Sequence, residues 1–123
     1  MKSKIIFIVE RDQEARVYFR KALEEKSHYV ISTASATEAL EMLKNMSGPH
    51  LVLLKPDPLD IEGADFIKFL RKIPWLKSVP ICQIGSENVP SLEGSCCTAE
   101  KADFEKILKW LDTGVPEKFW LMP

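Results

Sequence analysis

The sequence has no apolar run of the roughly 18 residues that a membrane-spanning helix needs. It also has no excess of charge of one sign, because 17 basic and 18 acidic residues give a formal net charge of −1. The first absence argues against a membrane protein. The second removes the electrostatic reason to expect nucleic acid or an anionic membrane surface as partner.

Cysteine is scarce. The three cysteines, Cys82, Cys96 and Cys97, are odd in number and lack the spacing of a disulfide framework, which is typical of a reducing compartment. Charged residues follow directly after Val9, so the apolar start is too short for a secretory signal, and we expect a cytoplasmic protein. Adjacent residues of a strand point to opposite faces, which favours buried side chains over a redox switch at Cys96 and Cys97.

No repeat, low-complexity tract, nucleophile–base pair or metal-ligating cluster is visible in the sequence. An enzyme is therefore the least expected class, and neither a cofactor nor a metal is expected. What is present is the composition of a globular domain: 123 residues, 46% of them apolar and 28% charged. That length is sufficient for one hydrophobic core.

Apolar, β-branched segments alternate with segments of helical period. Lys4–Val9 and Leu51–Leu54 are apolar almost throughout, as in strands covered on both faces, whereas the half-polar Tyr29–Thr33 is expected at a sheet edge. Further strands are expected at Val79–Ile84 and, short and weak, at Ser95–Ala99. The alternation predicts right-handed βαβ units, a mostly parallel sheet, and a site at the carboxyl ends of the strands.

Helix starts and one missing helix can also be predicted. Asp12 is a candidate N-cap, and Ser35 followed by Glu38 forms a capping-box pattern. Pro90 and the lack of a helical period predict that a helix between Ser86 and Glu93 is short or absent. The expected apolar helix faces are Ala15, Phe19, Ala22 and Leu23; Ala36, Ala39, Leu40 and Leu43; Phe66, Ile67, Leu70 and Ile73; and Phe104, Ile107, Leu108 and Leu111.

In this layout the chain resembles the receiver domain of two-component response regulators. The resemblance is carried by KIIFIVERD at 4–12, TASATEALEMLK at 33–44, and PHLVLLK at 49–55 before a proline-containing loop that ends at Gly63. It implies a flavodoxin-like (CheY-like) three-layer α/β sandwich with a five-stranded parallel sheet of order 2-1-3-4-5 and a reduced or absent fourth helix. The receiver-like domain would span 1–112, and 113–123 would be an aromatic tail.

The resemblance also implies a phosphorylation pocket, and its parts are replaced here. The position of the phosphoacceptor carboxylate holds Lys55, which cannot form an acyl phosphate. The metal-binding acidic pair is Glu10 and Arg11, with Arg11 at the position of the more direct ligand. The hydroxyl position is Gly85, with Ser86 one residue late.

Charge supports the same conclusion. Receiver pockets also hold a lysine after the fifth strand that contacts the phosphoryl oxygens. By spacing from Gly94, this lysine would be Lys101 here. The pocket of the family carries a net charge of about −2, which a divalent cation cancels. One carboxylate (Glu10) and two cations (Arg11 and Lys55) give +1 here, or +2 with Lys101. A magnesium ion would be repelled, so the chain resembles a degenerate (pseudo-receiver) member of the family.

Two interpretations of Lys55 stay open. It either pairs with Glu10 or Asp12, filling the space of the lost metal, or forms an anion site with Arg11 beside a helix N-terminus. Asp57 and Asp60 are interpreted as loop residues that cap turns or the next helix, in preference to a displaced phosphoacceptor at Asp57.

The function that follows is a non-phosphorylatable signalling module that acts by protein–protein interaction in a two-component or phosphorelay pathway. The alternative is a small-ligand or anion sensor at Arg11 and Lys55. The family implies a contact face near the fourth helix and fifth strand. The aromatic residues Trp110, Phe119 and Trp120 either pack back onto the domain or dock a partner, and both a monomer and a homodimer remain open.

Overall fold

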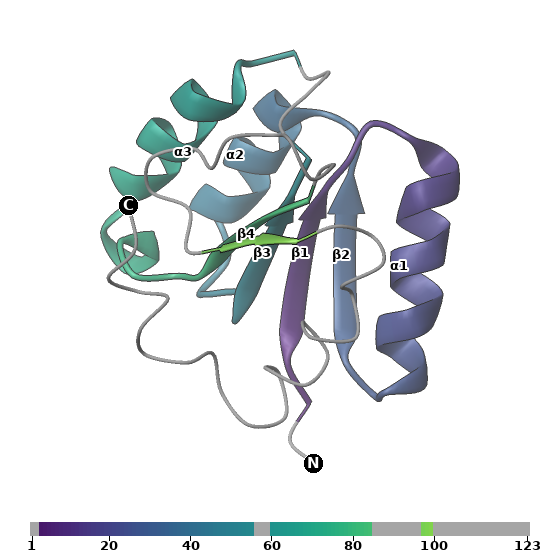
Figure 1. The fold of residues 1–123 in the computed structure, drawn as a ribbon. Coiled ribbons are helices and arrows are strands. Elements are labelled where there is room, and N and C mark those ends of the chain that lie inside the picture. Colours follow the sequence, from purple (N-terminus) through teal and green to yellow (C-terminus); the bar gives the residue numbers. More distant parts are fainter. Residues whose placement is uncertain (1–2, 56–59, 85–96, 100–123) are drawn as a thin grey trace.

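The computed structural model describes residues 3–55, 60–84 and 97–99. Its sheet contains the strands β1 (Ile5–Val9), β2 (Tyr29–Thr33), β3 (Leu51–Leu54), β4 (Ile81–Ile84) and β5 (Cys97–Ala99). The helices are α1 (Gln13–Glu25), α2 (Ala36–Lys44) and α3 (Gly63–Arg71), and a 3₁₀ turn, η1, spans Pro74–Leu76. Helix α1 covers one face of the sheet, and α2 and α3 cover the other (Figure 1).

All strand pairs are parallel, in the order β2-β1-β3-β4-β5. The predicted order 2-1-3-4 is therefore confirmed, with β2 at the edge, and the three-residue β5 pairs with β4. Strand β4 begins at Ile81 and not at the expected Val79. The reason is local, since the Val79 N–H donates back to the Leu76 carbonyl (3.4 Å), and Pro80 has no N–H to give to a strand.

Three expectations fall outside the described residues. They are the reduced fourth helix at 86–93, the last helix around 104–111, and the tail at 113–123. No helix within the described ranges is long and apolar enough to cross a membrane.

The core has two layers, separated by the sheet. Phe7 and Val9 of β1 join the cluster under α2 and α3, whereas Ile6 and Ile8 join the cluster under α1. The same alternation holds in β3, and all of these side chains are almost completely buried. Burial on both faces explains why these strands have no polar alternation.

Two helix caps show how far local sequence rules reach. Asp12 caps α1 as predicted, because its Oδ2 accepts from the Ala15 N–H (3.0 Å). At α2, Ser35 Oγ accepts from the Glu38 N–H (3.1 Å). The return half of the predicted capping box is not seen, because the Ser35 N–H donates to Thr33 Oγ1 (3.2 Å), so this part of the prediction is wrong.

The start of β1 is held by two histidines for which the sequence predicts no role. His28 Nδ1 accepts from the Lys4 N–H (3.1 Å), and His50 Nδ1 accepts from the Ile5 N–H (2.9 Å). The His50 N–H in turn donates to the Ile5 carbonyl (2.8 Å). These bonds tie the amino ends of β1, β2 and β3 together, at the opposite edge from the candidate site.

Candidate functional site

The ends of β1 and β3 bring Glu10 and Lys55 to the same edge of the sheet. Val9 is level with Leu54 in the parallel register. The Lys55 N–H donates to the Val9 carbonyl (2.9 Å), and the Glu10 N–H donates to the Thr33 carbonyl of β2 (3.1 Å). The backbone therefore places both residues directly after paired strand ends, as the sequence predicts.

Their side chains do not pair. Glu10 is 2% exposed, and its Oε1 accepts from the Asp12 N–H (2.9 Å). The Asp12 carboxylate caps α1. Neither carboxylate forms an ion pair with Lys55 among the described residues, so the predicted pair is wrong there. Each carboxylate instead accepts one hydrogen bond from a backbone N–H.

Arg16 is a site residue that the sequence analysis missed. Its Nη1 donates to the carbonyl oxygens of Glu10 (2.6 Å) and Arg11 (2.7 Å). These are the carbonyls of the turn from β1 into α1, which the guanidinium therefore holds in place. The sequence contains one indication of this role. Arg16 lies four residues after the cap Asp12, close to a helix N-terminus, where a cation is electrostatically unfavourable unless it has acceptors nearby.

The candidate site does not fit a magnesium ion. Magnesium requires hard oxygen ligands in octahedral geometry. Within the described residues, no group of three Asp, Glu, His or Cys side chains could hold a metal. Glu10 Oε2 is buried there without a hydrogen-bond partner, and the residues next to it in the turn and at the end of β3 include the cations Arg11 and Lys55.

Four predicted site residues lie outside the described residues: Asp57, Gly85, Ser86 and Lys101. Their contribution to the pocket therefore stays a prediction. The same holds for Trp110, Phe119 and Trp120.

Asp60 ties the loop after β3 to the start of α2. Its Oδ1 accepts from the Ala36 N–H (2.6 Å), and its Oδ2 accepts from the Ser35 hydroxyl (2.9 Å) and the Thr37 N–H (3.2 Å). The sequence predicted that Asp60 caps a turn or the next helix. It instead supports α2, the helix that precedes β3 in the sequence, although Asp60 itself follows β3.

This arrangement stabilises the ionised form of Asp60. The Thr37 side chain contributes most, and the N–H groups and the Ser35 hydroxyl add to it, so the pKa of Asp60 lies well below its usual range. A carboxylate that accepts several hydrogen bonds at a helix N-terminus is expected to behave in this way.

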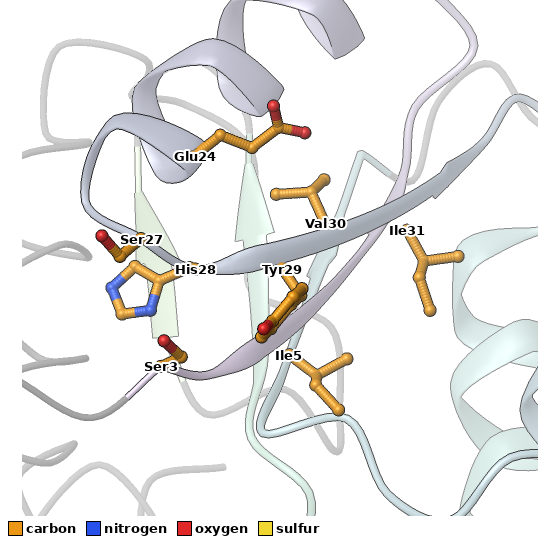
Figure 2. Close-up of a pocket in the computed structure, with 8 residues that line it drawn as sticks. All are labelled: Ser3, Ile5, Glu24, Ser27, His28, Tyr29, Val30 and Ile31. Atoms are coloured by element: carbon orange, nitrogen blue, oxygen red, sulfur yellow. The ribbon is translucent and has the colours of Figure 1, made fainter.

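A hollow of about 860 Å³ lies at the other end of the molecule, around the start of β2 (Figure 2). Val30 and Ile31 both line it, and they pack against opposite core layers. Because the hollow reaches residues on both faces of β2, it lies along the free edge of this strand. Its walls are mostly apolar, with Glu24 as the one acidic group among the described lining residues. It offers no cluster for catalysis.

Solved structures identify the architecture. The chain aligns with a receiver domain from Methylobacillus flagellatus at 26% identity and a TM-score of 0.76, covering 88% of this chain and 98% of that one. A chemotaxis response regulator of Vibrio cholerae aligns at 19% identity and a TM-score of 0.80, covering 93% and 100%. The chain has the receiver-domain fold.

A third structure with this fold comes from a sensor histidine kinase. The receiver domain of a sensor histidine kinase from Pseudomonas aeruginosa, with a magnesium ion in its active-site cleft, aligns at 14% identity and a TM-score of 0.75, covering 90% of this chain and 99% of that one. The sequence matches no protein-family model and no curated protein.

The lack of a carboxylate partner for Lys55 within the described residues can be tested by stability. We expect Lys55→Met to change the free energy of unfolding by less than about 0.5 kcal/mol, because no buried ion pair involves Lys55 among those residues. Urea unfolding measures this, with Leu53→Ala in the buried core as a control expected to cost about 2–5 kcal/mol. A loss of more than about 1 kcal/mol for Lys55→Met would show that the ammonium has a structural partner.

The role of Asp60 predicts a pH dependence. Because the pKa is lowered in the folded state, the stabilisation is fully present above the ordinary value of 3.8 and is lost as the pH falls below it. Asp60 is exposed, so solvent screening limits the loss in Asp60→Asn to about 0.3–1 kcal/mol near neutral pH. We expect the difference between the two proteins in urea unfolding to shrink below about pH 4; a difference independent of pH would contradict the assignment.

Proposed function

We propose that the chain is a signalling module of the two-component or phosphorelay type that acts by binding a protein and does not accept a phosphoryl group at position 55. The observation that carries the proposal is Lys55 at the carboxyl end of the central strand β3, with its backbone bonded to β1. No enzymatic activity is proposed.

The chemistry of phosphoryl transfer supports this proposal. An acyl phosphate requires a carboxylate nucleophile, and a metal ion must neutralise charge as the phosphoryl group arrives. Lys55 supplies an ammonium group instead. Arg11 cannot be deprotonated to make room for a metal ion, and Arg16 adds a third cation to the same turn.

The proposed partner is a protein, and the proposed compartment is the cytoplasm. The odd number of cysteines favours such a reducing compartment. The face near the fourth helix and fifth strand remains the contact surface expected from the resemblance, and most of its residues lie outside the described ranges. A homodimer remains an alternative assembly.

Phosphorylation with a small donor tests the proposal. We expect neither the natural chain nor Lys55→Asp to gain a phosphoryl group from acetyl phosphate and magnesium, because each missing charge contact costs several kcal/mol of barrier. Intact mass spectrometry measures the adduct. The matched comparison is Arg11→Asp combined with Lys55→Asp, which restores the acidic pair as well as the acceptor. A stoichiometric, base-labile adduct on the natural chain or on Lys55→Asp alone would refute the account.

The anion sensor is the second candidate, because Arg11 is exposed and Lys55 lacks a carboxylate partner within the described residues. Against it, the nearby N-terminus of α1 is already capped by Asp12. We expect sulfate and inorganic phosphate to raise the melting temperature of the natural chain and of Arg11→Gln/Lys55→Gln equally. Stabilisation that is lost in this variant, but kept in the control Lys21→Gln on α1, would favour the sensor.

A further inference from the structure

A groove of about 580 Å³ runs between α2, the end of α3 and η1. Two of its walls are aromatic residues with unusual exposure, Phe69 (47%) and Trp75 (54%). Leu40 and Ile73 form its apolar floor and belong to the buried core. The described lining residues are Leu40, Lys44, Phe69, Lys72, Ile73, Pro74 and Trp75.

The groove is held in a fixed shape. The indole N–H of Trp75 donates to the Met46 carbonyl (3.0 Å), which anchors η1 to the end of α2. Arg71 donates from one nitrogen to the carbonyls of Leu76 (2.9 Å) and Val79 (2.7 Å), which anchors η1 to α3. A preformed surface loses little entropy when a partner binds.

The polar groups of the groove are cationic. Lys44 and Lys72 line it, and no acidic side chain does so among the described residues. The Lys72 ammonium lies 5.8 Å from the centre of the Phe69 ring. Lys44 contacts Glu41 (3.4 Å), but both side chains are more than half exposed, so this pair is weak and Lys44 is available to a partner.

This combination favours an acidic peptide over a nucleic acid. Stacked bases need open aromatic faces, whereas the Lys72 ammonium already occupies one face of Phe69. An apolar side chain between two aromatic walls, with carboxylates at the rim, satisfies both the shape and the charge.

We propose that this groove docks a short acidic segment of a partner protein, which places an apolar side chain between Phe69 and Trp75 and carboxylates beside Lys44 and Lys72. The inference rests on the proposed protein-binding role. It assigns that role to the α2–α3 face, away from the Lys55 edge.

A selection experiment tests the proposal. A displayed library of random peptides of about 12 residues, a length typical of groove-binding segments, is selected against the full chain. We expect the bound peptides to be enriched in Asp and Glu next to Leu, Phe or Trp. Their affinity, measured by fluorescence anisotropy, should fall as salt is raised.

Variants then locate the binding. Phe69→Ala and Trp75→Ala should each raise the Kd of a selected peptide at least about thirtyfold, as expected of aromatic anchors. Lys44→Glu combined with Lys72→Glu should raise it at least about tenfold by repulsion. Tyr18→Ala and Lys21→Glu are the matched controls, since both residues are exposed on α1, across the sheet, and should leave the Kd unchanged. Because the charge variants change two exposed residues and leave both aromatic walls in place, they keep the test valid if Trp75→Ala unfolds.

Several outcomes would overturn the proposal. These are selected peptides without acidic residues, an oligothymidine that competes for the groove, self-association that Trp75→Ala abolishes, or competition by a peptide of residues 113–123. Selected peptides that bind but ignore the groove variants would refute this surface and leave the protein-binding role intact. A phosphoryl adduct on the natural chain would refute the non-phosphorylatable part of the proposed function and leave the groove proposal unaffected.

Discussion

Strand β1 is hydrogen-bonded to β2 on one side and to β3 on the other, while both of its faces are buried. A slip of one residue would move Phe7 and Val9 into the wrong layer, so the register is strongly determined. The register also fixes the positions of Glu10 and Lys55 at the carboxyl edge, because they directly follow Val9 and Leu54, which are paired between β1 and β3. The residue types at these two positions therefore contribute directly to the chemistry that the edge can support.

The sequence could predict what depends on short-range patterns. The two buried strands were visible as apolar runs, and Asp12 was visible as a cap, because both depend on neighbouring residues. It failed where distant groups compete for the same atom. Asp60 reaches α2 from 24 residues away, and the carboxylates of Glu10 and Asp12 bond to backbone N–H groups instead of Lys55. Opposite charges at adjacent strand ends are not sufficient to predict a pair when unsatisfied N–H groups lie closer.

The carboxyl edge is held together by the protein's own groups. Arg16 binds the carbonyls of the turn after β1, and Asp60 binds the N-terminus of α2. A guanidinium on carbonyl oxygens and a carboxylate on N–H groups satisfy the backbone without help from an ion. Nothing in this set of bonds needs a phosphoryl group to complete it. The described part of this edge is therefore held in its arrangement by hydrogen bonds within the chain.

The same bonds link the edge to the groove on the α2–α3 face. Asp60 fixes the start of α2, and the end of α2 carries Lys44 and leads to the Met46 carbonyl that holds Trp75. A ligand at the edge that displaced Asp60 would have to move α2 to alter this side of the groove, which would disturb the buried contacts of Leu40 and Leu43 in the core. Packed interiors resist such shifts. The packing of α2 and α3 therefore resists any change in the groove that would start at the Lys55 edge.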